Sequence, residues 1–201
     1  SNAIDAEAYR AQASGRQFRK ELDVEDGLLV SFVGRLIPEK GIDALLEIMG
    51  SLQDRSVHLA VAGDGPLFDQ VDTSPLPNVH ALGRLNSSDT AALLMDSDLF
   101  CLPTRSEGFS TSLLEAAACG TASLVPDVGG AREIIPNDSF GFVSERVDVN
   151  KYAEIIRSVD DGKFDLKAMG IKCRLHVEKL LSWSDVAACV VDACNLSGTH
   201  R

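Results

Sequence analysis

Short apolar segments that alternate with helical patterns restrict the fold of this chain more than any other feature. The segment 28–33, LLVSFV, is almost entirely apolar and ends directly before a glycine. Strands buried on both faces of a parallel sheet have this continuous apolar character. The segment 42–52 instead repeats apolar residues every three or four positions, as one face of a helix does. The alternation predicts βαβ units, a parallel sheet and therefore an α/β fold.

The same alternation continues to the end of the chain. Further strands are predicted at 57–62, 78–82, 98–103, 121–126 and 140–143. Further helices are predicted at 110–119, 131–136, 149–160, 168–180 and 184–195, with Ser184 as the cap of the last one. Another helix carries Ala91, Leu94 and Met95, and Asn86 or Ser87 is expected to cap it.

These elements predict one Rossmann-like domain over residues 27–201, with helices on both faces of its sheet. Residues 4–26 are polar and weakly periodic, which indicates a lead-in segment with one short helix. Residues 1–3, Ser-Asn-Ala, have the sequence of an expression-tag remnant and are excluded from the fold reasoning.

Composition excludes several classes of protein. The 201 residues carry 30 acidic and 19 basic side chains, and a net charge of -11 argues against a nucleic-acid-binding protein. No apolar run reaches the length of a membrane-spanning helix. Five cysteines at irregular spacings, without a CxxC pair, indicate reduced thiols in the cytoplasm rather than a disulfide framework or a zinc site. The four histidines show no metal-ligand spacing either.

Candidate functional residues follow the predicted strands, because ligands of open α/β sheets bind beyond the carboxyl ends of the strands. Neither GxGxxG nor GxxxxGK[ST] occurs, so the nicotinamide fingerprint and the P-loop are both absent. The first strand is followed by GRLIPEKG, in which Arg35 and Lys40 stand five positions apart. Two cations across this turn could converge on a diphosphate. The alternative is that Arg35 pairs with an acid and Lys40 is solvated.

The segment 106–120, SEGFSTSLLEAAACG, is the strongest signal in the sequence. It places Glu107 in a loop and Glu115 inside the following helix, with the helix N-terminus between them as a potential anion site. Both carboxylates could accept hydrogen bonds from the vicinal hydroxyls of a sugar or a ribose. Alternatively, Glu107 interacts with the helix dipole and Glu115 is solvated.

GRLIPEKG, followed by two glutamates with seven residues between them, resembles the donor-binding domain of group 1 glycosyltransferases (glycosyltransferase family 4). The resemblance runs from about Ile4 to the final helix and includes GDGP at 63–66, LPTRSEGF at 102–109 and DVGG at 127–130. It implies the C-terminal half of a GT-B fold and a retaining, metal-independent transfer from a UDP- or GDP-sugar without a cofactor. It also implies that 4–26 ends an interdomain linker, that an N-terminal acceptor domain is absent, and that membrane contact could come only through that domain.

The resemblance also implies roles for individual residues. Arg35 and Lys40 would hold the diphosphate and stabilise the leaving group, Glu107 would hold the transferred sugar, and Glu115 would bind the ribose. The first three are the catalytic candidates. The remaining predicted contacts are mainly backbone groups: Gly34, Gly63, the base-binding backbone of Arg84 and Leu85, the amides of Gly108, Phe109 and Ser110, and Thr111.

Two departures from the family pattern and two other functions remain open. Ser110 replaces the common glycine of EGFG, so it could crowd the sugar or contact it, and the donor sugar is undetermined. Ala122 replaces the common proline of CGTP and should matter little. A nucleotide-sugar epimerase of the same architecture, or a non-catalytic nucleotide-binding module, would also fit the fold.

Overall fold

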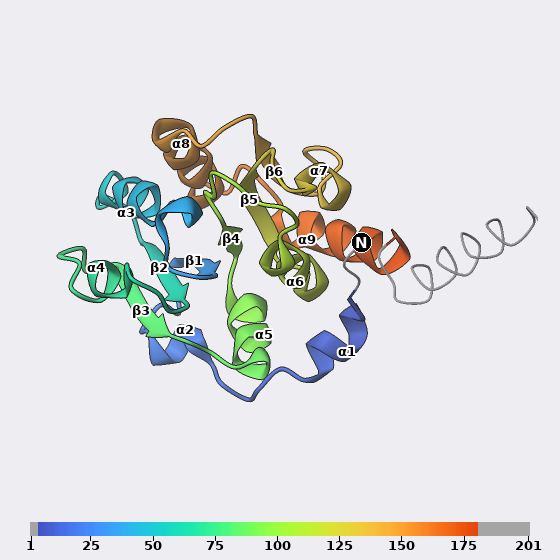
Figure 1. Ribbon diagram of the computed structural model, residues 1–201. Coiled ribbons are helices and arrows are strands. Elements are labelled where there is room, and N and C mark those ends of the chain that lie inside the picture. The colour runs from blue at the N-terminus through green and yellow to red at the C-terminus, as the bar shows by residue number, and fades with distance from the viewer. Residues whose placement is uncertain (1–3, 181–201) are drawn as a thin grey trace, which may run out of the picture.

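The computed structural model describes residues 4–180 and contains one parallel six-stranded sheet (Figure 1). The strand order is β3-β2-β1-β4-β5-β6, the order of a Rossmann-like sheet. The strands are β1 (Leu28–Val33), β2 (Val57–Ala62), β3 (Val79–Gly83), β4 (Leu99–Cys101), β5 (Ala122–Pro126) and β6 (Phe142–Ser144). The predicted fold class is therefore confirmed.

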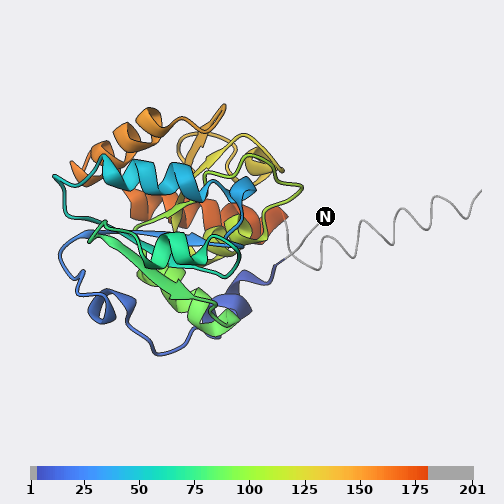
Figure 2. The same ribbon diagram turned by 60° about the vertical axis from the view of Figure 1, so that its left-hand side comes forward.

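Both faces of the sheet are covered by helices, which explains why its strands are predominantly apolar. Side chains alternate between the faces: in β2, Leu59 and Val61 enter the main core, whereas Ala60 and Ala62 enter a second, smaller core. Figure 2 shows α3 (Ile42–Gly50) and α8 (Val149–Asp160) above the sheet, with α1 (Ala6–Ala11), α2 (Phe18–Glu21) and α5 (Ser87–Asp96) below it.

Four further helices complete the layers: α4 (Phe68–Asp72), α6 (Thr111–Cys119), α7 (Ala131–Ile134) and α9 (Leu166–Leu180). Helix α9 packs along α6 and also contacts β5, α1 and α7. A short 3₁₀ turn, η1 (Pro38–Lys40), precedes α3.

The lead-in segment is more structured than the sequence predicts, because it forms two helices rather than one. Helix α1 packs against α6 and α5, and Phe18 of α2 is fully buried in the second core together with Val24. Arg19 fixes this segment by donating hydrogen bonds to the carbonyl oxygens of Val24 and Gly27 and by pairing with Asp98. Residues 4–26 are thus packed onto the sheet domain.

Several predicted boundaries were too long or shifted by one to three residues. The predicted strand at 98–103 is β4, Leu99–Cys101, and the predicted helix at 131–136 ends at Ile134. The helix predicted to carry Ala91, Leu94 and Met95 is α5, in which Ala91 and Leu94 are buried and Met95 is 46% exposed. The helix expected at 184–195 lies outside the described residues. Within 4–180, no helix is long and apolar enough to cross a membrane.

Candidate functional site

The carboxyl ends of β1, β2 and β3 are joined by backbone hydrogen bonds. The Gly34 amide donates to the Ala62 carbonyl oxygen (3.0 Å), and the Gly63 amide donates to the Gly83 carbonyl oxygen (2.8 Å). The Leu36 amide adds a bond of 2.9 Å to the Asp64 carbonyl oxygen. These bonds fix the GRL and GDGP segments against each other before any ligand binds.

Gly63 is required by this close approach. Its backbone has φ = 154°, and a Cβ atom on it would lie 1.8 Å from the carbonyl oxygen of Gly34. A separation below 3.0 Å forces the neighbouring backbone to move, so no other residue fits here without displacing the loop after β1.

A pocket of about 490 Å³ opens between these strand ends. Nine residues line it: Val33, Gly34, Arg35, Ala62, Gly63, Asp64, Arg84, Leu85 and Thr90. Arg35 and Arg84 are both exposed, and neither forms an ion pair or side-chain hydrogen bond with another residue in the range 4–180. The wall therefore holds two guanidinium groups without an ion-pair partner and one carboxylate, Asp64, and this excess of positive charge favours an anionic ligand.

Lys40 and Glu107 form an ion pair beside the β1 and β4 strand ends. The two residues are 67 positions apart in sequence, and their side chains are only 16% and 15% exposed. The pairing joins a cation predicted to bind phosphate to a carboxylate predicted to bind sugar. The sequence analysis considered a ligand-bound or a solvated Lys40, and it did not predict the ion pair with Glu107.

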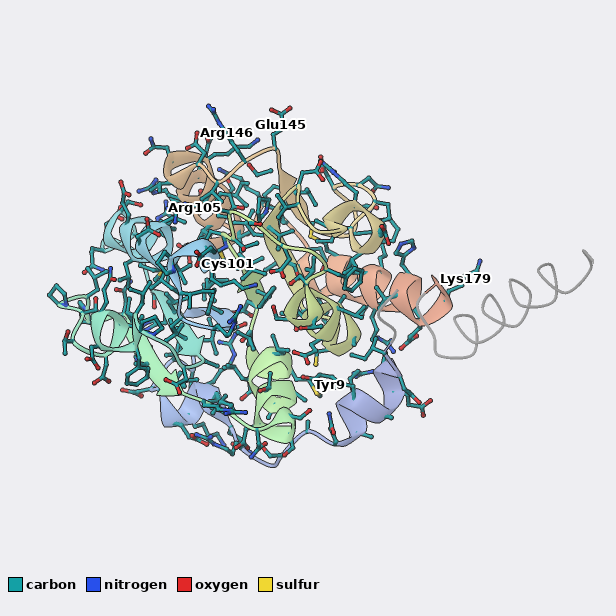
Figure 3. The ribbon with its side chains drawn as sticks, viewed as in Figure 1. Tyr9, Cys101, Arg105, Glu145, Arg146 and Lys179 are labelled. Carbon is teal, nitrogen blue, oxygen red and sulfur yellow. The ribbon has the colours of Figure 1, made fainter. Side chains whose placement is uncertain are left out.

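The loop after β4 is fastened to the turn that carries Lys40. The Arg105 amide donates to the Glu39 carbonyl oxygen (2.7 Å), and the Thr104 hydroxyl donates to the same oxygen (3.1 Å). The Arg105 guanidinium donates to the Pro38 carbonyl oxygen (2.8 Å) and pairs with Asp43 (2.6 Å). Figure 3 labels Arg105 at this junction. These contacts determine which carboxylate Lys40 meets.

The DVGG loop after β5 packs against Glu107 from the other side. Gly129 has φ = 57°, and a Cβ atom there would lie 2.6 Å from the Glu107 Cβ. A Cβ atom on the next residue, Gly130, would lie 3.3 Å from the ring of Phe109. The structure thus brings the loops after β4 and β5 together around the ion pair.

Ser110 caps helix α6. Its side chain is buried, and its hydroxyl oxygen accepts a hydrogen bond from the Leu113 amide (3.2 Å). The N–H groups of Thr111 and Ser112, in the first turn, have no partner inside the helix. The departure from glycine at 110 is therefore explained by helix capping, and neither crowding of a sugar nor a hydroxyl contact is needed to account for it.

Glu115 lies on α6, and the helices α5 and α1 pack against α6. Burial raises the pKa of its carboxyl group, and no other side chain in residues 4–180 donates a hydrogen bond to it. Glu115 is thus neither the freely solvated residue of the alternative interpretation nor part of the pocket wall.

Of the predicted site residues, the pocket wall brings together Gly34, Arg35, Gly63, Arg84 and Leu85. Lys40 and Glu107 meet next to the wall without forming part of it, and the loop residues Gly108 to Thr111 lie at the start of α6.

The sequence analysis missed four residues of the wall, Val33, Ala62, Asp64 and Thr90, and one neighbour of Glu115, Tyr9. The first two end strands that were predicted, so the strand ends themselves were the available signal. Nothing in the sequence pattern singled out Thr90 or Tyr9.

Other titratable side chains lie away from this site or are buried. His58 and His80 stack on neighbouring strands, with 3.2 Å between Nδ1 of the first and Nε2 of the second, and burial lowers the pKa of both. Burial raises the pKa of Cys101 (Figure 3) to about 12. Within the described part of the chain, no three His, Cys, Asp or Glu side chains gather as a metal site would require.

Comparison with known proteins identifies similar sequences. The model of a family described as glycosyl transferases group 1 matches residues 14–172. A GDP-mannose-dependent monoacylated alpha-(1-6)-phosphatidylinositol monomannoside mannosyltransferase of Corynebacterium glutamicum is 32% identical over 178 residues, which cover 82% of this chain and 46% of that protein. The GPI3 subunit of phosphatidylinositol N-acetylglucosaminyltransferase of Saccharomyces cerevisiae is 30% identical over 215 residues, with 98% and 45% covered. The chain spans about half the length of these curated relatives.

Solved structures share the fold at lower sequence identity. Anabaena HepE in complex with UDP-glucose superposes with a TM-score of 0.80 at 19% identity, over 96% of this chain and 56% of that one. A glycosyltransferase from Rickettsia africae gives a TM-score of 0.82 at 17% identity, over 100% of this chain and 57% of that one. In each, a chain of this fold makes up about half of a longer protein.

Proposed function

Because the chain belongs to the group 1 glycosyltransferases, we propose that it is the donor-binding half of a retaining transferase that moves a sugar from a nucleotide-diphosphate sugar to an acceptor. Its fold is that of one half of a GT-B glycosyltransferase, as the sequence predicts. The observation that carries the proposal is the pocket at the strand ends. Its residues Arg35 and Arg84 form no ion pair with another described residue, and the Lys40–Glu107 ion pair lies near the pocket.

The diphosphate would bind between Arg35 and Lys40. An arginine offers a planar fork of donors and a lysine offers a compact charge, so the two can hold different oxygens of the same diphosphate. Lys40 has three N–H donors and remains able to bind phosphate while it contacts Glu107. As the bond to the sugar breaks, these cations and the first N–H groups of α6 would stabilise the negative charge that collects on the nucleoside diphosphate. This division of labour requires no metal ion.

The sugar would lie over the loop after β4. Glu107 would accept hydrogen bonds from its hydroxyls, and the amides of Gly108, Phe109 and Ser110 would face the sugar and the phosphates. Because Lys40 pairs with Glu107, the Glu107 carboxylate would contact both the bound sugar and the lysine that binds the phosphates.

The base would bind in the pocket, against the backbone around Arg84 and Leu85. Glu115, which lies on α6 outside the pocket wall, would accept the hydroxyls of a ribose that extends from the pocket toward α6. One relative is named for GDP-mannose, and one solved structure of the same fold is bound to UDP-glucose, so GDP and UDP are the nucleotides to test first.

The other half of the enzyme would supply the acceptor site. We propose that residues 27–201 form the donor domain, that 4–26 lead in from an interdomain linker, and that the acceptor domain belongs to the part of the relatives that this chain does not span. Any contact with a membrane would come through that domain. The cysteines Cys101, Cys119 and Cys173 are free and buried, which supports a reducing, cytoplasmic setting.

The first test is calorimetric titration of the chain with UDP, GDP, ADP and their sugars. We expect binding of one ribonucleoside diphosphate without added metal ion. A folded protein that binds none of them would favour the non-catalytic module and would contradict the donor-domain proposal.

The second test is transfer. A labelled nucleotide sugar and a broad acceptor mixture are incubated with this chain alone and with a protein that also contains the upstream domain. Positioning two substrates supplies about 7–11 kcal/mol of barrier lowering, so transfer should require both domains. The anomeric configuration of the product, read by NMR, tests retention. Multiple turnover by this chain alone would refute the half-enzyme proposal, and release of a free epimeric nucleotide sugar would support the epimerase.

A further inference from the structure

The connection from β3 to α5 forms one side of the pocket (Figure 1) and contributes Arg84, Leu85 and Thr90 to its wall. Leu85 offers apolar surface, as do Val33 and Ala62 at the neighbouring strand ends, and the face of a flat ring can lie against such surface. Apolar contact of this kind does not distinguish one base from another. The choice among bases therefore falls to the polar side chains of this connection.

Other polar side chains of the connection are occupied within the protein. The Asn86 side chain caps α5: its oxygen accepts a hydrogen bond from the Asp89 amide (2.8 Å), and its nitrogen donates to the Asp89 carboxylate (3.1 Å). The Ser87 hydroxyl is bonded to a side chain of α1 (2.9 Å). None of these three residues is part of the pocket wall, to which the connection contributes two polar side chains, Arg84 and Thr90.

Thr90 can act on a ligand as an acceptor. The residue is 7% exposed, and its hydroxyl donates its single proton to the Asn86 carbonyl oxygen (2.8 Å), one turn earlier in α5. A hydroxyl group has one proton and two lone pairs, so the Thr90 oxygen can still accept a hydrogen bond while this bond is in place.

Arg84 has the opposite chemistry. A guanidinium group carries N–H donors and no acceptor. Arg84 is exposed and forms no ion pair or side-chain hydrogen bond with another residue in the range 4–180. One short connection thus offers the pocket a donor and an acceptor.

We propose that Arg84 and Thr90 select the base of the donor by binding a lactam edge, in which a ring carbonyl oxygen stands next to a ring N–H. The inference rests on the proposed function, because it takes the pocket to be the base site. Uracil, with O4 beside N3–H, and guanine, with O6 beside N1–H, carry this edge. Arg84 would donate to the oxygen, and Thr90 would accept from the N–H.

Cytosine and adenine present the reversed pattern, an amino group beside an unprotonated ring nitrogen. Against this edge, the donors of Arg84 would face the amino group, and the lone pairs of Thr90 would face the ring nitrogen. Polar groups that lose water without gaining a partner weaken binding, so a site with this pattern rejects the two amino bases.

Asp64 is a competing acceptor in the wall. It follows β2 rather than β3, it is exposed, and its Oδ1 already accepts a hydrogen bond from the Gly65 amide (2.7 Å). The variant Asp64→Asn is therefore part of the test. If it removes the base preference and Thr90→Val does not, the acceptor is Asp64 and the assignment to Thr90 is wrong.

The experiment measures Kd by calorimetry for two pairs of nucleotides, IDP with ADP and UDP with CDP. The two members of each pair have the same ring size and differ in the lactam or amino edge. In the ring size that binds, the wild type should bind the lactam member at least about tenfold more tightly. Equal affinities within both pairs, or a preference for ADP or CDP, would overturn the proposal.

Thr90→Val should reduce this preference about three- to tenfold, the effect of one hydrogen bond, by weakening the lactam member alone. The variant should fold, because the Thr90 amide still donates to the Asn86 carbonyl oxygen (2.9 Å). The matched control is Thr121→Val. The Thr121 hydroxyl is also buried and donates to a carbonyl oxygen of α5, that of Leu94 (2.6 Å), but Thr121 lies outside the pocket wall. Thr121→Val should leave the preference unchanged.

Two arginine variants separate the base from the phosphates. Arg84→Met should reduce the preference for the lactam member, whereas Arg35→Met should weaken both members of a pair equally. If the wild type binds none of these nucleotides and no GDP, the proposed function fails and this inference fails with it. If a nucleotide binds but neither Thr90→Val nor Arg84→Met changes the preference, the proposed function stands and the selection of the base by these two residues is overturned.

Discussion

Breaking the Lys40–Glu107 ion pair should destabilise the free protein unequally from its two sides. The perturbations are Lys40→Met, Glu107→Gln and the double variant. With Glu107 removed, the flexible lysine stem can carry its charge to water. With Lys40 removed, the Glu107 carboxylate is left under Gly129, which lies against its Cβ. Lys40→Met should therefore cost more than Glu107→Gln.

The magnitude follows from how deeply the pair is buried. Breaking a fully buried pair costs about 3–5 kcal/mol, whereas exposed pairs contribute about 0–1 kcal/mol. Side chains that are 16% and 15% exposed lie between these limits. We expect a loss of about 2 kcal/mol for Lys40→Met, about 1 kcal/mol for Glu107→Gln, and a coupling of about 1 kcal/mol between them. For a domain of this size, 2 kcal/mol corresponds to about 4–8 °C in melting temperature.

The assay is a double-mutant cycle from urea unfolding at low ionic strength. The control cycle uses Arg132→Met and Asp127→Asn, since that pair lies at the same end of the sheet but is 44% exposed on both sides. Its coupling should stay below the coupling between Lys40 and Glu107. Additivity of Lys40→Met and Glu107→Gln within about 0.3–0.5 kcal/mol would show that the contact contributes no stability, and the reasoning from burial would be refuted.

The remaining predictions concern the pocket. Arg35→Ala should weaken nucleoside diphosphates by about 1.5–3 kcal/mol in calorimetry and monophosphates by less; equal affinities for wild type and variant would remove Arg35 from the phosphate site. Glu115→Gln should abolish the preference for a ribonucleotide over its 2′-deoxy analogue. Because the raised pKa of Glu115 means that its charge opposes folding once the pH exceeds the unfolded pKa, the same variant should melt at a higher temperature than the wild type at pH 7 and at no higher temperature at pH 4. Gly63→Ala should lower the melting temperature and abolish nucleotide binding, whereas Gly15→Ala, which has nothing within 4 Å of its new Cβ, should do neither.

The sheet was predictable because its strands are buried on both faces. Burial makes segments such as 28–33 and 57–62 almost entirely apolar, and the glycine that follows each marks its end. Helix α4 and the turn η1 were missed because three to five residues are too short for a helical period. The two lead-in helices were not separated for the same reason, although Phe18 fixes one of them in the core.

Sheet topology allowed the sequence to predict which loops meet at the candidate site, but not which side chains pair there. Strands β1 and β4 are neighbours in the sheet, so the segments after them, with Lys40 and Glu107, had to lie close together. Their direct pairing depends on Arg105 and Thr104 holding the two loops, which no spacing of motifs encodes. Tyr9 belongs to a different segment of the chain, and the Glu115 charge acts on it because helix α1 packs on α6.

A chain of net charge -11 can hold a diphosphate because its cations are placed unequally. Several cations away from the pocket are neutralised locally: Arg19 pairs with Asp98, and Arg55 pairs with two aspartates. At the pocket, Arg35 and Arg84 form no ion pair with another described residue, and the wall holds a single carboxylate, Asp64, so the two positive charges exceed the negative charge at short range. Charges farther away than about 8–10 Å are screened by salt, so the overall negative charge acts weakly there. Raising ionic strength should therefore weaken nucleotide binding, because it screens the attraction of these two cations, even though the protein as a whole repels anions.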